Sequence, residues 1–192
     1  MKITEFHNIQ AIENVPSILG HGILSNERAA QLPHKSVAMS EVQERRDKVK
    51  VPKGLRLHQY ANRYFHARNP MMFKRKGMAS KLCVLRIAKK AMQLSGAVIA
   101  DQNASSNWVR FLAPSQIDQL NLTAVFATDW RDDYEPAYWR KKSQKCAELL
   151  IPHVLPVDFI EGAYVVNAKA QKDLESTGFE LPISIDADLF FH

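Results

Sequence analysis

The sequence has few cysteines and no metal-binding pattern. Only two cysteines occur among the 192 residues, Cys83 and Cys146, and each lies in an apolar run without CxxC spacing. Such cysteines are typical of buried thiols in a reducing compartment, and they support neither a disulfide framework nor a zinc site. The seven histidines also show no tight ligand spacing, so the sequence predicts no metal centre.

Glycine motifs for nucleotide phosphates and long apolar runs are missing as well. The seven glycines form neither GxGxxG nor GxxxxGKS/T, so the sequence supports neither a Rossmann fold nor a P-loop. No window approaches the roughly 20 apolar residues that a membrane helix needs, and the first five residues, MKITE, do not open a signal peptide. We therefore expect a cytoplasmic protein without a membrane partner.

The charge of the chain is positive and unevenly spread. The formal net charge is +6, and the pI is about 9.3. Residues 45–90 are rich in lysine and arginine with Asp47 as the only acid, whereas residues 129–135 are acidic. A basic stretch of this breadth favours a polyanionic partner, although an ordinary basic surface has the same composition.

Apolar patterning predicts one globular domain, spanning residues 1–192, with short elements of both kinds. Helices are expected at residues 14–22, 40–47, 88–94, 115–120, 134–144 and 168–176, and strands at residues 3–6, 59–65, 82–87, 97–100, 124–127, 147–151, 159–166 and 182–186. Residues 25–35 resemble a loop, residues 68–73 a turn, and Trp139 a buried helix position. Short strands without regular βαβ spacing predict an α+β fold with a mixed, largely antiparallel sheet.

An acidic residue inside an apolar strand is the most informative local feature. The segment at residues 145–152 reads KCAELLIP, and strand alternation places Glu148 and Leu150 on one face and Leu149 and Ile151 on the other. A carboxylate that enters a half-buried sheet needs a partner. The segment VQERR at residues 42–46 could supply one. The alternative is a carboxylate on an edge strand that faces water.

A second polar feature lies near the N-terminus. The expected strand at residues 3–6 ends at His7, a polar turn follows at residues 7–9, and Asn14 can cap a helix that has Pro16 in its first turn. A polar group between a strand end and a helix N-terminus can hold an anionic or ribose-bearing ligand. The alternative for His7 is an ordinary surface or core histidine.

Taken together, several separated segments resemble one family, the DarT-type DNA ADP-ribosyltransferase toxins of toxin–antitoxin systems. The resemblance follows the family's order over nearly the whole chain. It is carried by NVPSILGHGIL at residues 14–24, KSVA at 35–38, VQERR at 42–46, VP at 51–52, YF at 64–65, RNPMM at 68–72, DQNA at 101–104 and CAELLI at 146–151.

The resemblance implies an ADP-ribosyltransferase fold and a glycosyltransferase reaction. The donor would be NAD, as a co-substrate, and the acceptor a base, expected to be thymidine, in single-stranded DNA. A cognate antitoxin with a de-ADP-ribosylating domain is implied as a partner, and the chain is expected to be a monomer. Residues 31–49 would close over NAD, and residues 97–148 would include the loop that presents DNA.

The resemblance also assigns residue roles. Glu148 is implied as the catalytic glutamate and Arg46 as an NAD contact that assists the acceptor step. Further NAD contacts fall on Ser17, on Ser25 and, after a one-residue shift, on His7, Asn8 and Ile9. The shift is needed because His7 precedes Asn14 by seven residues, where the family pattern has six.

The chemistry itself calls for these residue types. Breaking the bond between nicotinamide and ribose builds positive charge on the sugar, and a carboxylate such as Glu148 stabilises that charge. A thymine ring nitrogen must then lose a proton, for which Glu148 is a better base than Arg46, because arginine stays protonated.

Two other functions remain open on the sequence. One is a non-catalytic module that binds single-stranded nucleic acid through the basic region at residues 45–90, with Tyr60, Tyr64, Phe65 and Phe73 as stacking platforms. The other is an ADP-ribosyltransferase that acts on RNA or protein.

Overall fold

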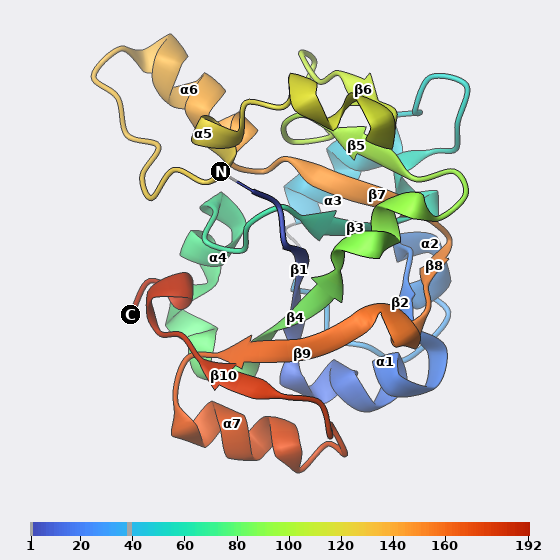
Figure 1. Cartoon of the computed structure of the whole chain (residues 1–192), viewed down its shortest axis with the longest axis vertical. Helices are drawn as coiled ribbons and strands as arrows, with labels where there is room; N and C mark the ends of the chain where they lie inside the picture. The colour runs from blue at the N-terminus through green and yellow to red at the C-terminus, as the bar shows by residue number, and fades with distance from the viewer. Residues whose placement is uncertain (1, 38–39) are drawn as a thin grey trace.

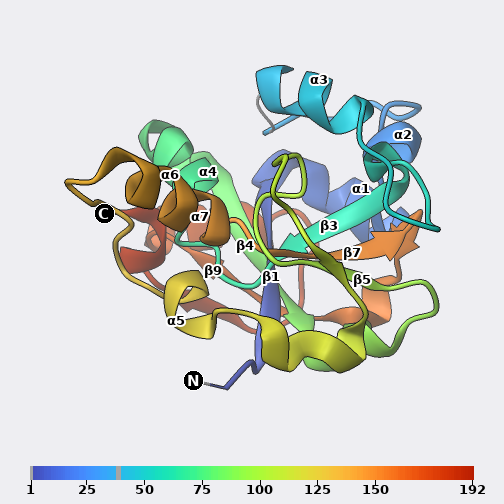
Figure 2. The same ribbon diagram turned by 90° about the horizontal axis from the view of Figure 1, so that it is seen from above.

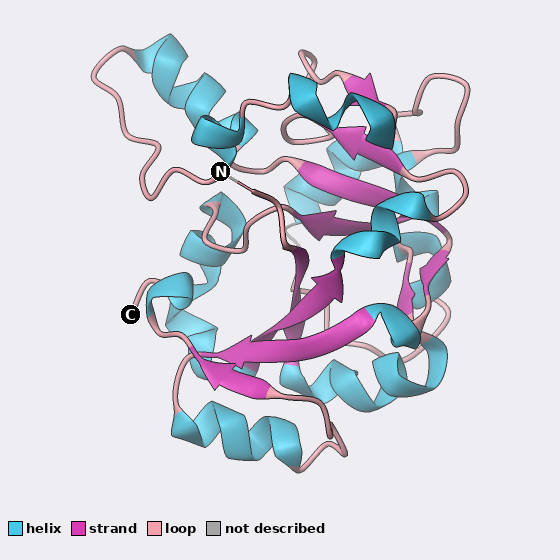
Figure 3. Cartoon of the chain, in the orientation of Figure 1, coloured by secondary structure: helices cyan, strands magenta, loops and turns pink. Residues whose placement is uncertain are grey.

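The fold is organised around one large mixed sheet. The computed structural model describes residues 2–37 and 40–192, and these form an eight-stranded sheet of order β10-β9-β4-β1-β3-β7-β5-β6 and a two-stranded sheet of β2 and β8 (Figures 1 and 3). The strands are β1 (Glu5–Ala11), β2 (Ile23–Leu24), β3 (Tyr60–Tyr64), β4 (Leu82–Ala88), β5 (Val98–Ala100), β6 (Phe111–Leu112), β7 (Glu148–Pro152), β8 (Val154–Leu155), β9 (Ile160–Val165) and β10 (Ile183–Ile185).

The helices are short and lie around this sheet. In Figure 2, α3 lies on one side of β3 and β7, and α5 lies on the other side. The helices are α1 (Val15–His21), α2 (Asn26–Ala29), α3 (Ser40–Asp47), α4 (Pro70–Arg75), α5 (Leu122–Val125), α6 (Glu135–Gln144) and α7 (Ala168–Glu175). The 3-10 helices are η1 (Ile12–Asn14), η2 (Leu57–Gln59), η3 (Lys76–Lys81), η4 (Lys89–Gln93), η5 (Pro114–Gln119), η6 (Val157–Phe159) and η7 (Asp188–Phe190).

Antiparallel pairing dominates the sheet, as the sequence predicted. Among the strand pairs that the structure describes, β10 and β9 run parallel and the others run antiparallel. β1 joins the two halves of the sheet, because it pairs with β4 along its full length and with β3 at His7 and Tyr64. The predicted α+β class is confirmed.

β1 is longer than the pattern suggested. The polar turn expected at residues 7–9 belongs to the strand, which continues to Ala11 because every residue from Glu5 onward pairs with β4. The polar residues that follow Phe6 therefore mark a change in the surroundings of the strand and do not mark the end of the strand.

Two segments that the sequence assigned to loops and turns contain helices. Ser25 precedes α2, and its hydroxyl accepts a hydrogen bond from the backbone N–H of Arg28 at 3.4 Å. Asn69 precedes α4, and its Oδ1 accepts from the N–H groups of Met71 and Met72, with Pro70 at the first helical position. The turn predicted at residues 68–73 was wrong because Asn-Pro serves here as a helix start.

Two predictions near residue 130 were also wrong. Residues 124–127 do not form a strand, because Asn121 caps α5 by accepting from the N–H of Ala124. Trp139 is 55% exposed, because α6 turns Ala137 toward the protein interior instead. The helix predicted at residues 40–47 is confirmed, because α3 spans Ser40–Asp47.

The main core lies between the sheet and the helices that cover it. Its side chains come from all parts of the chain, and the rings of Phe6 on β1 and Phe65 after β3 meet edge to face at 5.0 Å. Within the residues that the structure describes, no helix is long and apolar enough to cross a membrane.

Candidate active site

A buried ion pair between Arg46 and Glu148 forms the centre of the site. Arg46 Nη1 donates to Glu148 Oε1 at 2.7 Å, and the side chains are only 8% and 2% exposed. The backbone N–H of Ala104 donates to the same Oε1 at 3.2 Å. Glu148 Oε2 is buried and has no hydrogen-bond partner among the described residues. The protein therefore holds one carboxylate oxygen by two hydrogen bonds and leaves the other without a partner among the described residues.

The pair is electrostatically strong because water is excluded from it. Burial by itself lowers the pKa of Arg46, but the charge and hydrogen bond of Glu148 outweigh this effect and raise the pKa above its ordinary value. Arg46 thus keeps its positive charge beside the carboxylate. Arg45, its neighbour on α3, is exposed.

Glu148 lies on β7, an interior strand of the large sheet. β7 lies between β3 and β5, where Glu148 is paired with Tyr64 on one side and Ala100 on the other. The alternative of an edge-strand carboxylate facing water was wrong, because Glu148 is 1% exposed. Burial and the charge of Glu148 together raise the pKa of Tyr64 well above its usual range, so this phenol stays protonated.

Glu148 and Arg46 open onto a cleft of about 500 Å³. This volume is in the range of sites for small molecules and cofactors. The cleft is lined by residues from β1, α1, α3, β3 and α6, among them Asn8, Ile9, Gln10, Asn14, Ser17, Lys35, Arg46, Tyr60, Asn62, Tyr64, Asn103, Trp139, Lys142, Cys146 and Glu148.

A chain of amide side chains runs along one wall of the cleft. Asn8 Nδ2 donates to the carbonyl of Asn62 at 3.0 Å, and Gln10 Nε2 donates to Asn8 Oδ1 at 2.9 Å. Asn14 exchanges hydrogen bonds with the backbone of Lys35, at 2.8 and 2.9 Å. Sequence reasoning missed Gln10 and Asn14 as site residues. The i, i+2 spacing of Asn8 and Gln10 on one strand face was the available signal.

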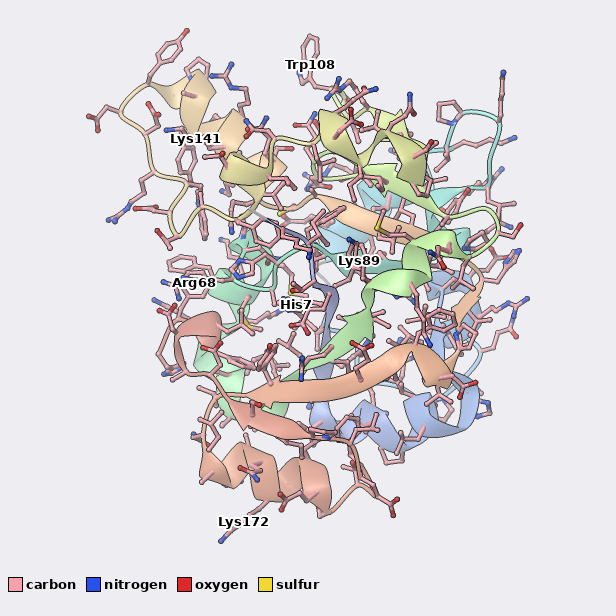
Figure 4. All side chains as sticks on the ribbon, viewed as in Figure 1. His7, Arg68, Lys89, Trp108, Lys141 and Lys172 are labelled. Carbon is pink, nitrogen blue, oxygen red and sulfur yellow. The ribbon has the colours of Figure 1, made fainter. Side chains whose placement is uncertain are left out.

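His7 faces away from the cleft. Its Nε2 lies 3.0 Å from Glu5 Oε1, and its Nδ1 accepts from the N–H of Ala67 at 2.9 Å. The centre of its ring lies 5.8 Å from that of His66 and 5.7 Å from that of Tyr164, which it meets edge to face. Figure 4 labels His7 near the middle of the view. The structure therefore does not bring His7 to the cleft, whereas Asn8 and Ile9, which were predicted with it, line the cleft.

Of the two predicted serines, one lines the cleft and one does not. Ser17 on α1 is a lining residue, whereas Ser25 is fully buried at the start of α2, beside a second and separate cavity. The Ser25 hydroxyl accepts from the N–H of Arg28, and Ser25 is not among the residues that line the cleft.

The thiols and possible metal ligands take no visible part in the ion-pair site. Both cysteines are free, Cys83 in the core and Cys146 partly exposed at the cleft, and burial raises the pKa of each to about 12. Within residues 2–37 and 40–192, no group of three or more His, Cys, Asp or Glu side chains could hold a metal ion.

The fold matches solved structures of other proteins over nearly the whole chain. One is DarTG of Thermosipho africanus in complex with ADP-ribose, with a TM-score of 0.86 and 24% identity over 98% of this chain and 51% of that one. Another is DarT of Thermus sp. 2.9 in complex with ADP-ribosylated single-stranded DNA, with a TM-score of 0.82 and 25% identity over 98% and 96% of the chains. The chain therefore has an α+β fold of the ADP-ribosyltransferase-like kind.

Sequence comparison identifies the family. A family model described as ssDNA thymidine ADP-ribosyltransferase, DarT, matches residues 7–191, and the chain belongs to this family. A DNA ADP-ribosyl transferase of Thermus sp. (strain 2.9) is 28% identical over 89% of this chain and 85% of that protein. A DNA ADP-ribosyl transferase–DNA ADP-ribosyl glycohydrolase fusion protein of Thermosipho africanus is 28% identical over 99% of this chain, which spans about half of its length. The resemblance noted in the sequence is thus confirmed.

Proposed function

We propose that this chain transfers ADP-ribose from NAD to a thymidine base in single-stranded DNA and releases nicotinamide. The observation that carries the proposal is the buried Arg46–Glu148 pair at a cleft of cofactor size. Relatives named as DNA ADP-ribosyl transferases, and a similar structure that holds ADP-ribosylated single-stranded DNA, support the choice of acceptor.

Glu148 has two tasks in this reaction. As the bond between the ribose C1′ and the nicotinamide nitrogen breaks, nicotinamide leaves with the electron pair, and the Glu148 carboxylate stabilises the positive sugar. The thymine ring nitrogen then forms a bond to C1′ and gives its proton to a base, which we assign to Glu148. Arg46 and the Ala104 N–H hold Oε1, so Oε2 is the oxygen that meets the ligand.

NAD is bound by the cleft wall. Asn8, Ile9, Ser17 and Arg46 line the cleft and contact NAD directly. The Arg46 guanidinium can bind a phosphate oxygen with more than one N–H, which lysine cannot do. His7 and Ser25 support the site without contacting NAD. His7 positions β1 next to Asn8 by accepting from the N–H of Ala67, and Ser25 positions the start of α2 by accepting from the N–H of Arg28.

DNA binding and the wider biological role follow from the same activity. The positive net charge favours a polyanion, and a paired thymine would hide its ring nitrogen, so the acceptor is single-stranded. We expect the chain to act as a monomer. It works in the cytoplasm, where such DNA is exposed, and a glycohydrolase partner reverses the modification. The Thermosipho relative carries such an activity in one polypeptide.

Mass spectrometry of oligonucleotides tests the proposal. Purified protein is incubated with NAD and short single-stranded DNA of varied sequence, with matched duplex DNA, RNA and a protein mixture as parallel acceptors. We expect one ADP-ribose to be added to thymidine-containing single strands, and the rate to fall as salt rises. Binding of DNA without modification would support the non-catalytic module instead. Modification of RNA or protein alone would replace the acceptor.

A further inference from the structure

Two exposed tryptophans lie on segments that lead to Glu148. Trp108 is 85% exposed in the loop at residues 101–110 between β5 and β6, and Trp139 is 55% exposed on α6. Figure 4 shows Trp108 projecting from the edge of the molecule, and in Figure 2 its loop reaches out on the side of the sheet where α3 lies. Single exposed aromatic side chains are common on protein surfaces. These two, however, lie on segments that hydrogen bonds connect to Glu148 and to each other.

The loop that carries Trp108 is closed at its base and attached to the site. Arg110 Nε lies 2.7 Å from Asp101 Oδ2, and the Arg110 N–H donates to Asp101 Oδ1 at 2.9 Å. Between them, the N–H of Ala104 donates to Glu148 Oε1. Trp108 follows Ala104 by four residues, so its backbone lies at most about 14 Å from that contact.

α6 presents the second tryptophan at the cleft. Trp139 and Lys142 both line the cleft, and Lys142 Nζ lies 4.4 Å from the centre of the Trp139 ring. The backbone N–H of Asn103 donates to the carbonyl of Ser143 at 2.9 Å, which joins the Trp108 loop to the end of α6. The loop at residues 101–110 and α6 therefore form one hydrogen-bonded frame beside Glu148, and this frame carries both tryptophans.

We propose that Trp108 and Trp139 are stacking platforms for the nucleotides next to the modified base, and that Lys142 binds a backbone phosphate beside Trp139. The inference rests on the proposed function. Aromatic rings interleaved with a cation are the combination that binds single strands without reading each base, since every base has a stacking face. The frame then sets the distance between a stacked neighbour and the base that enters the cleft.

Affinity for DNA tests the platforms without any chemistry. Fluorescence anisotropy is measured with a labelled twelve-nucleotide thymidine-containing strand in the absence of NAD. We expect Trp108→Ala and Trp139→Ala each to weaken binding about 5- to 100-fold. Trp108→Phe and Trp139→Phe should keep most of the affinity, because they retain a ring. Tyr134→Ala, which removes an aromatic side chain that is 68% exposed and precedes α6, is the matched control and should bind as the wild type does.

Modification of the same strand with NAD separates this inference from the proposed function. If the two tryptophans are stacking platforms, their replacement by alanine raises the KM for DNA by a larger factor than it lowers kcat. The Phe variants should then have a KM close to that of the wild type. Wild-type affinity in both Ala variants, or equal losses in Tyr134→Ala, overturns the platforms. A wild-type protein that consumes NAD but modifies no DNA refutes the proposed function, and the anisotropy series still decides for or against the two tryptophans.

Discussion

Arg46 and Glu148 stand 102 residues apart in the sequence, and their side chains meet at 2.7 Å in the interior of the protein. α3 supplies Arg46, and β7, an interior strand of the large sheet, supplies Glu148. The contact joins the segment that flanks the cleft to the residue that would act on NAD. Its geometry leads to the following predictions.

Replacing Glu148 by glutamine should remove transfer while keeping the fold. Glutamine can still accept from Arg46 and from the Ala104 N–H, but it carries no charge to stabilise the sugar or take a proton. We expect the transfer rate to fall by at least about 10²-fold, measured by the gel shift of a modified oligonucleotide. A circular-dichroism spectrum that shows the variant folded at the assay temperature would rule out unfolding as the cause, and a normal rate in this variant would refute the assignment.

Replacing Glu148 by alanine should instead destabilise the protein. The change leaves the Arg46 guanidinium buried without its counter-charge, which costs about 3–5 kcal/mol of unfolding free energy. Urea denaturation of the single variant and of the double variant Arg46→Met/Glu148→Leu measures this. We expect the double variant to regain most of the loss, because apolar side chains of similar volume replace the whole pair. Equal instability of both variants would mean that packing, and not charge, is decisive.

Arg46 should be far more sensitive than Arg45. Arg46 is buried against Glu148, whereas Arg45 is exposed. Arg46→Lys keeps a charge but loses the planar fork, so we expect both Arg46→Lys and Arg46→Ala to lower the transfer rate strongly. Arg45→Ala should keep most of the rate and mainly weaken DNA binding. Steady-state rates of the three variants at one salt concentration decide the matter, and a loss in Arg45→Ala as large as that in Arg46→Ala would refute the assignment of Arg46.

The Asp101–Arg110 pair should matter because it closes the loop that holds Glu148. With Asp101→Ala, the Ala104 N–H is no longer fixed on Oε1, and a small displacement of a reacting group can cost up to about 10²-fold in rate. We expect roughly a 10-fold fall in kcat with little change in the KM for NAD. Asp129→Ala removes a similar carboxylate–arginine pair, with Arg131, outside this loop. A matching loss in that control would show that surface pairs in general support the rate.

His66 should make the fold sensitive to mild acid. Burial, followed by the nearby charges of Lys145, His7 and Arg68, lowers its pKa to about 3. Between pH 6.5 and 3 the unfolded chain then binds more protons than the native one, so stability falls as the pH falls through this window. The loss at pH 5 relative to pH 7.5 should reach about 2 kcal/mol.

Urea denaturation at the two pH values measures this loss. His66→Asn should flatten the difference, and His34→Gln, which changes an exposed histidine, should leave it in place. Glu5 does not interfere, because its lowered pKa of about 2 affects stability only below its unfolded value of 4.5. An unchanged pH difference in His66→Asn would refute the assignment.

The sequence by itself determined the class of the fold and the identity of the central acid. Strand periodicity located β4, β5, β7, β9 and β10, and the apolar run around residue 148 singled out Glu148, because a lone carboxylate among buried side chains demands a partner. The joint order of several separated segments indicated the family. These features are local or follow from order along the chain, so the sequence displays them directly.

Local signals misled where polar side chains had two uses. Asn69 and Ser25 read as turn or loop residues, and each begins a helix by accepting backbone N–H bonds. The same side chains favour both turns and helix starts, and the packing of the following residues decides between them.

Only the tertiary structure decided what each polar residue faces. β1 turns Asn8 and Gln10 toward the cleft and His7 toward Glu5, although the three are nearly adjacent in the sequence. The Ala104 N–H reaches Glu148 only because β5 pairs with β7. Which strand neighbours which is fixed by long-range pairing and by burial over the whole chain, and a linear pattern carries no record of it.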